Sequence, residues 1–212
     1  MHYNERKSVF RRLLNVMTHC LPAVFWCLLL FSFDTPYIAM LTLLCAFIHE
    51  CGHELYICVK TGKLRIPRGA VNGLKISYDE LSRLSYGEEA ILYAAGPFAN
   101  ILMTLIFPLY ARLGEYALYF AIINLTTAAS NLIPIKGYDG YGILNAFLRR
   151  SLPPHVSERI TETLSFSSTL ILCIISLYFI DRFGESYWIF FVFSASLLSG
   201  VTQSLKKHNC EE

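Results

Sequence analysis

Two histidines stand four residues apart in the segment HECGH, His49 to His53, and Glu50 directly follows the first of them. Residues at this spacing lie on one face of a helix, so both imidazoles can bind one metal ion. Zinc lowers the pKa of water bound to it to about 7, and a neighbouring glutamate can take the proton as the hydroxide attacks a carbonyl group. The segment therefore predicts a metallopeptidase site, in which Gly52 is expected to open room beside the metal.

This segment lies in one of the most apolar parts of the chain, the stretch FIHECGHELYICV from Phe47 to Val59. A charged side chain at the centre of a membrane-spanning helix costs roughly 2.5–3.5 kcal/mol, and such residues usually mark a functional site. The setting therefore favours the catalytic interpretation. Glu54 is the weaker case, because it lies a turn nearer the cytosolic end and could simply reach water.

Catalytic zinc normally has three protein ligands and one open position, so a third ligand is needed. Cys45 is four residues before His49 and shares its helix face, whereas Glu54 lies about 100° around the helix from the second histidine. Asp139, in the segment NLIPIKGYDG, follows a predicted span and returns to the cytosolic edge of the membrane. Its depth is compatible with that of the histidines, while Cys45 lies deeper. We therefore favour Asp139 as the third ligand.

HECGH followed downstream by the pattern NxxPxxxxDG, Asn131 to Gly140, resembles the site-2 protease family of intramembrane zinc metalloproteases. A third segment, GPFAN from Gly96 to Asn100, resembles the family's GPxxN segment, although Gly-Pro and small residues also serve ordinary helix packing. The resemblance covers a catalytic core from Pro36 to Gly140. Gly137 and Gly140 are expected to allow a tight re-entrant turn around Asp139.

The resemblance implies a role for each matching residue. His49, His53 and Asp139 would bind one zinc ion per chain, and Glu50 would be the general base. Asn131 would contact the substrate backbone or help to stabilise the oxyanion. The expected activity is cleavage of a membrane-spanning or membrane-tethered protein near the cytosolic face, with release of a cytosolic fragment.

Within the family, the chain looks most like the branch that contains stage IV sporulation protein FB, which processes a membrane-tethered sigma-factor precursor. This resemblance implies a bacterial cell-membrane protein with a sigma factor or regulator as its substrate, a role in sporulation and a membrane inhibitor or regulator as a second partner. We expect no PDZ-like and no CBS-like domain, so residues 1–212 would form a single protease domain. Tyr138 stands where the family usually has leucine, a departure that concerns substrate fit more than zinc.

The elements that must position these residues are membrane-spanning helices. Of 212 residues, 54% are hydrophobic and 16% are charged, and the mean hydropathy is +0.44. A soluble domain carries about 25% charged residues, and each span needs ~20 mainly apolar ones. The sequence therefore predicts an all-α polytopic membrane protein. Six spans are expected, at Val16–Phe33, Pro36–Val59, Gly87–Ala111, Tyr116–Pro134, Thr163–Ile180 and Tyr187–Leu205.

The positions of lysine and arginine predict the orientation. Of the 18 such residues, all but Arg112 and Arg182 precede the first span, follow the last, or lie in the loops after spans two and four. By the positive-inside rule, both termini and both long loops are cytosolic. The first span, although preceded by basic residues, ends in FSFDTP without a signal-peptide cleavage site and is expected to be a retained anchor.

The loop between spans two and three favours a small cytosolic β-hairpin. Asn72-Gly73 stands between the β-prone runs LRIPRGAV and LKISY, which is a strong hairpin signal. A free strand edge there could hold an unwound substrate segment by strand addition. An ordinary amphipathic hairpin without this role is an equally open interpretation.

Two other functions are compatible with HExxH in a membrane. A CAAX-type membrane zinc protease uses the same motif, but NxxPxxxxDG argues against it. A non-catalytic zinc-binding protein or transporter would not need Glu50 as a base. The seven cysteines form no CxxC pair, so no disulfide framework is expected. Basic residues lie along the membrane edges without interleaved aromatic residues, so nucleic acid is not expected as a partner.

Overall fold

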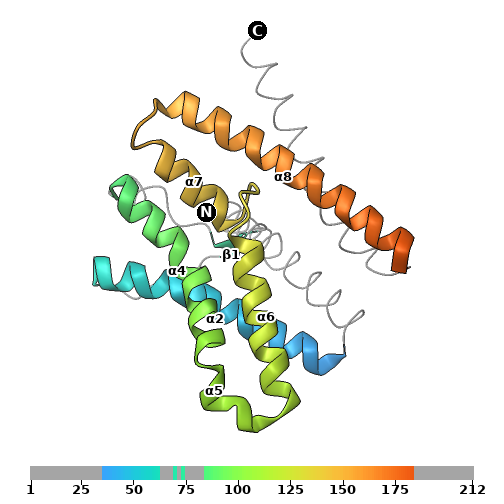
Figure 1. Cartoon of the computed structure of the whole chain (residues 1–212). Helices are drawn as coiled ribbons and strands as arrows, with labels where there is room; N and C mark the ends of the chain where they lie inside the picture. The colour runs from blue at the N-terminus through green and yellow to red at the C-terminus, as the bar shows by residue number, and fades with distance from the viewer. Residues whose placement is uncertain (1–34, 63–68, 71–72, 75–83, 184–212) are drawn as a thin grey trace, which may run out of the picture. The chain divides into compact units, whose positions relative to one another are not determined.

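The computed structural model describes residues 35–62, 69–70, 73–74 and 84–183 (Figure 1). The described part is mostly helical. Its main helices are α2 (Pro36–Thr61), α4 (Tyr86–Leu105), α6 (Glu115–Asn131), α7 (Asp139–Leu148) and α8 (Pro154–Phe183), with the short α5 (Phe107–Tyr110) and the 3-10 turn η1 (Ala111–Leu113) between α4 and α6. The predicted first and sixth spans lie outside the described residues.

Local sequence explains where these helices begin and end. Helix α2 has Pro36 in its first turn and is capped at its C-terminus by Gly62, which has a φ of 68° and donates its N–H to the carbonyl of Cys58. Helix α4 begins with a capping box, because the Ser85 N–H donates to the Glu88 carboxylate at 2.9 Å and the Glu88 N–H to the Ser85 hydroxyl at 3.4 Å.

Two described helices, α2 and α8, are long and apolar enough to cross a membrane. A third candidate arises if α4 and the segment Phe107–Leu113, which meet at a bend of 51°, form one broken span. Large apolar side chains such as Phe47, Leu55 and Leu109 are exposed, as expected for helices that face lipid. The described part thus has the character of a helical membrane protein, and the total of six spans remains a prediction.

Two of the predicted boundaries that differ from the structure have a local cause, and the third span, expected at Gly87–Ala111, is interrupted where α4 ends at Leu105. The fourth span was expected to reach Pro134, but α6 ends at Asn131 and has 17 residues, because proline disfavours helical geometry in the residue before it. The fifth span was expected from Thr163, but α8 begins at Pro154. Proline suits a first helical turn, so the polar segment Pro154–Glu162, which looks like a loop by hydropathy, is helical.

Only four residues of the predicted hairpin are described, and the hairpin as a whole stays a prediction. Strands β1 (Gly69–Ala70) and β2 (Gly73–Leu74) pair antiparallel, with Gly69 opposite Leu74 and Ala70 opposite Gly73. Gly73 is therefore a paired strand residue, whereas the sequence placed it in the turn.

The chain divides into two compact units, Met1–Leu84 with Ala95–Ala128, and Ser85–Ala94 with Ala129–Glu212. Helices α4 and α6 each continue from one unit into the other. In the first unit, the residues of α2, α4 and α6 that are fully buried or nearly so include small and amide ones: Ala39, Cys45, Asn100, Ala117, Ala121, Asn124 and Ala128. Small residues allow the close helix approach typical of membrane proteins.

In the second unit, α7 and α8 pack side by side (Figure 1). The Ser157 hydroxyl lies 3.2 Å from Oδ1 of Asn145, and the Lys136 N–H donates to the Ser165 hydroxyl at 2.7 Å. The latter bond fixes the loop between α6 and α7 to α8. This loop leads directly into Asp139, the first residue of α7.

Candidate metal centre

Helix α2 brings the two histidines of HECGH together. His49 and His53 are both buried, and their Nε2 atoms lie 3.3 Å apart. Two nitrogens that bind one tetrahedral zinc at 2.0–2.1 Å are about 3.3–3.4 Å apart. The imidazole pair therefore fits zinc both in the chemistry of its donors and in their spacing.

Helix α4 makes room for this pair. A Cβ atom built on Gly96 would fall against Nε2 of His53 and, at 2.7 Å, against Nε2 of His49. Only glycine leaves the space between α4 and the two Nε2 atoms open. The sequence had assigned that role to Gly52, which was wrong: a Cβ atom there would meet the carbonyl of Ala95 and the Cβ of Ala99 at 2.9 Å. Gly52 instead allows α2 and α4 to approach closely.

The other ring nitrogen of His49 has a partner on α4. Nδ1 of His49 lies 2.8 Å from Oδ1 of Asn100, which is fully buried. Nδ2 of Asn100 donates to the backbone carbonyl of Cys45 at 3.0 Å and to Oδ1 of Asn124, on α6, at 2.7 Å. From the sequence, GPFAN was interpreted as a family-like segment with helix packing as the alternative, and the contact of Asn100 with His49 was not predicted. A signal was available, because an amide in an apolar span seldom lacks a partner.

Asp139 is positioned by local structure in the second unit. Gly137 has a φ of 99°, and a Cβ atom on Gly140 would meet the carbonyl of Leu132. Both glycines are therefore needed for the chain to turn at this point, as predicted. As the first residue of α7, Asp139 places its carboxylate at the positive end of a helix dipole, which stabilises an anion by about 0.3–1 kcal/mol.

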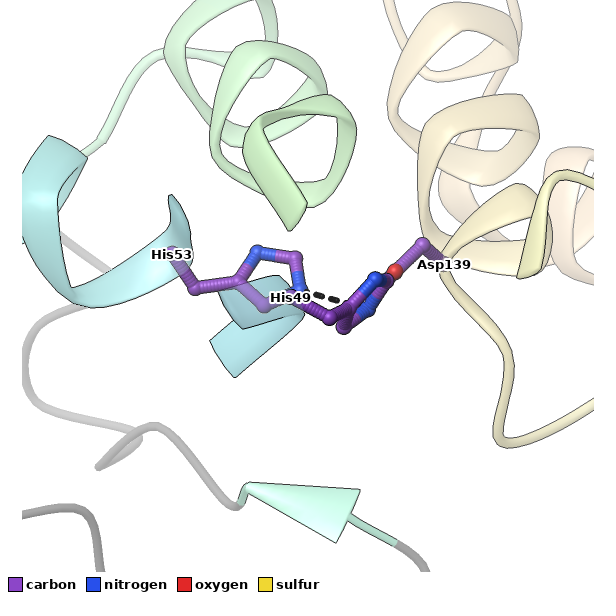
Figure 2. A group of neighbouring side chains, drawn as sticks. All are labelled: His49, His53 and Asp139. Atoms are coloured by element: carbon purple, nitrogen blue, oxygen red, sulfur yellow. Dashed lines mark hydrogen bonds between the residues drawn. The ribbon is translucent and has the colours of Figure 1, made fainter. Parts of the chain in front are cut away.

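His49 and His53 belong to the first unit, and Asp139 belongs to the second. Figure 2 shows the two imidazoles, which come from α2, and the carboxylate, which comes from the start of α7. Within the first unit, the Cys45 thiol lies 3.9 Å from the carbonyl of Phe120.

The remaining predicted residues are placed as follows. Glu50 follows His49 on α2, and its Oε2 atom is buried. Asn131 is the last residue of α6 and is partly exposed. The substrate-binding role of Asn131 and the base role of Glu50 remain predictions, because a catalytic role would be defined by contacts with a substrate.

Two tyrosines flank the aspartate. Burial raises the pKa of Tyr138. Burial also raises the pKa of Tyr141 to about 12, with the carboxylates of Glu162 and Glu158 acting in the same direction. Both side chains are therefore neutral hydrogen-bond donors at physiological pH.

The structure is similar to the site-2 protease from Methanocaldococcus jannaschii, with a TM-score of 0.60, 18% sequence identity, and coverage of 89% of this chain and 88% of that one. This likeness shows a shared fold.

In sequence, the chain is 26% identical over 133 residues to the "Putative zinc metalloprotease Rip2" of Mycobacterium tuberculosis. The match covers 58% of this chain and about half, 48%, of the length of that relative. No family model matches the chain. The shared fold and the metalloprotease relative together support the site-2 protease family, the one that the motifs HECGH and NxxPxxxxDG indicated.

Proposed function

We propose that this protein is an intramembrane zinc endopeptidase that cleaves a membrane-tethered protein near the cytosolic face and releases a cytosolic fragment. The observation that carries the proposal is the convergence of the Nε2 atoms of His49 and His53 at 3.3 Å, a spacing that fits one zinc ion. The sequence relative named "Putative zinc metalloprotease Rip2" and the fold shared with a site-2 protease support the same activity.

In this proposal, His49, His53 and Asp139 hold one zinc ion per chain. The bound ion would act as a Lewis acid, which would lower the pKa of a bound water and polarise a carbonyl group. Glu50 accepts the proton of the attacking water and passes it to the leaving amine as the peptide C–N bond breaks. Asn131 contacts the substrate backbone beside the carbonyl that is attacked.

The proposal includes a location. The protein would lie in the cell membrane of a bacterium as a multi-pass protein, with both termini and the basic loops in the cytosol. Its substrate would be a protein with a membrane-spanning or membrane-tethered segment, and a membrane inhibitor or regulator is a second expected partner. A sigma-factor precursor, with a role in sporulation, is one candidate substrate that the family branch suggests.

The decisive experiment measures zinc content and cleavage in detergent for the wild type, Glu50→Gln and Glu54→Gln. A panel of tethered substrates, including a sigma-factor precursor, is supplied to each. The wild type is expected to bind one zinc per chain and cut at least one substrate. Glu50→Gln should retain zinc and lose cleavage, because glutamine keeps the size of the side chain but cannot accept the proton.

Glu54→Gln is the matched control, since it makes the same change one turn further along α2, at a residue that also has a buried Oε2 atom. It is expected to retain both zinc and cleavage. If Glu50→Gln cuts as well as the wild type, or if the wild type holds no zinc, the proposal is wrong. Zinc binding by a wild type that cuts no tethered peptide would favour a zinc-binding protein without catalytic activity.

A further inference from the structure

A buried chain of amide hydrogen bonds connects the metal centre to helix α6. His49, Asn100 and Asn124 belong to α2, α4 and α6, and both asparagines are fully buried. The links are 2.8 Å from His49 to Asn100 and 2.7 Å from Asn100 to Asn124. Nδ2 of Asn124 then donates to the carbonyl of Phe120 at 2.8 Å. All of these residues lie within the first compact unit.

Backbone carbonyls determine which way each amide points. The carbonyl of Cys45 can only accept a hydrogen bond, so the group of Asn100 that faces it must be the NH2 group. The carbonyl of Phe120 imposes the same condition on Asn124, and Oδ1 of Asn124 therefore faces Asn100. If either amide were rotated by half a turn, its Oδ1 would face the backbone carbonyl oxygen of Cys45 or Phe120, and neither oxygen can donate a hydrogen bond.

The orientation of Asn100 fixes the proton on His49. Both hydrogens of Nδ2 are used, one on Cys45 and one on Asn124, so the atom that faces His49 is the oxygen Oδ1. An oxygen acceptor at 2.8 Å requires a proton on Nδ1 of His49. In a neutral imidazole, Nε2 then carries the lone pair, and Nε2 is the atom that faces His53.

We propose that Asn100 and Asn124 are positioning residues of the metal centre, which hold His49 in the tautomer and orientation that present the Nε2 lone pair to zinc. The inference rests on the proposed function, because it takes His49 to be a zinc ligand. Metal-binding histidines commonly donate their other N–H to a carboxylate or a carbonyl oxygen. Asn100 supplies such an oxygen from α4, and Asn124 prevents its amide from turning over.

The amide suits this place better than a carboxylate would. A charged acceptor among apolar helices would carry the cost of a buried charge. It would also bring a second negative oxygen against the carbonyl of Cys45 and Oδ1 of Asn124, both of which are acceptors. Asn100 gives His49 an acceptor and donates to both neighbours without adding a charge.

A role in helix packing alone is the competing explanation, and one control variant isolates it. The Thr104 hydroxyl, one turn after Asn100 on α4, lies 3.1 Å from the carbonyl of Asn100 and 3.2 Å from the carbonyl of Ala121 on α6. Thr104→Val therefore removes a polar contact between α4 and α6 without touching an imidazole.

The test measures zinc affinity by competition with a chromophoric chelator, together with the unfolding temperature, on the full chain in detergent. Asn100→Leu is expected to weaken zinc binding by about 10–100-fold, the usual effect of removing such an outer partner. Asn124→Leu should weaken it less, because Nδ2 of Asn100 still donates to Cys45. Thr104→Val should lower the unfolding temperature and leave zinc affinity unchanged. Unchanged zinc affinity in Asn100→Leu would overturn the inference.

A second measurement does not depend on whether Asn100→Leu folds. Nitrogen-15 NMR of the zinc-free wild type, with histidine labelled and His49 assigned through His49→Ala, should show the neutral ring protonated at Nδ1. A proton on Nε2 would overturn the inference. Neither readout needs cleavage. A protein that binds zinc but cuts no substrate would therefore contradict only the proposed function. Unchanged zinc affinity in an Asn100→Leu variant that still cuts would contradict only this inference.

Discussion

Nδ1 of His49 lies 2.8 Å from Oδ1 of Asn100, although the two residues are 51 positions apart in the chain. The contact belongs to a single face of α4, on which Gly96, Asn100 and Thr104 follow one another at intervals of four residues. Gly96 leaves space for the imidazoles, Asn100 contacts His49, and Thr104 reaches the backbone of α6. Helix α4 therefore shapes the candidate metal centre without contributing one of its predicted ligands.

Gly96→Ala is expected to abolish tight zinc binding, because the added Cβ would fall against Nε2 of both histidines. Gly87→Ala is the matched control, since it lies on the same helix and its added Cβ would meet nothing within 4 Å. Alanine is favoured over glycine in a helix by about 1 kcal/mol. The control should thus fold at least as well as the wild type and bind zinc normally. Chelator competition measures both variants, and equal affinities would contradict this account of Gly96.

Asp139→Asn is expected to lower zinc affinity by more than about 100-fold, beyond what the loss of an outer partner costs. Asparagine keeps the size of the side chain and removes the negative charge of the ligand. Cys45→Ala tests the competing third ligand. It should cost about 1 kcal/mol of stability as a small core truncation and leave zinc affinity intact. The reverse result, with zinc lost in Cys45→Ala and kept in Asp139→Asn, would show that the thiol is the ligand.

The sequence was sufficient to predict the parts of the site that depend on local spacing. Helical periodicity put His49 and His53 on one face, and two glycines marked the turn before α7. The choice of Asp139 over Cys45 followed from depth in the membrane, which span positions define. The resemblance to the site-2 protease family, read from these motifs, is confirmed by the comparisons.

What the sequence did not predict depends on which helix meets which. Periodicity assigns residues to a face but does not name the helix that the face contacts. The role predicted for Gly52 was therefore wrong, and the positions of Gly96 and Asn100 beside the histidines were not predicted. The start of α8 was not predicted for another reason. Its first turns are polar and begin with proline, and the hydropathy pattern does not distinguish such a segment from a loop.

The phenol of Tyr141 should lose its proton at a higher pH than an ordinary tyrosine. Its pKa is raised to about 12, from an ordinary 10.0, by burial and by the carboxylates of Glu162 and Glu158. The folded state thus holds the phenol proton more tightly than the unfolded state. The resulting stability is fully present below pH 10 and is lost as the pH rises towards 12. The difference in tyrosinate absorbance between the wild type and Tyr141→Phe should show a step near pH 12, and a step near pH 10 would contradict the environment described for this side chain.

Gly137→Ala should separate backbone strain from the placement of the ligand. Gly137 has a φ of 99° and Gly114 a φ of 79°, and an added Cβ would meet nothing within 4 Å at either position. Alanine at each site should therefore cost about 1–3 kcal/mol of stability through backbone strain alone.

Only Gly137 lies two residues before Asp139. Gly137→Ala alone should therefore also weaken zinc binding, by about 10-fold, as for other changes that misplace a ligand. Thermal unfolding and chelator competition on both variants measure the two effects. Equal loss of stability with normal zinc affinity in both would mean that the turn at Gly137 does not position the Asp139 carboxylate.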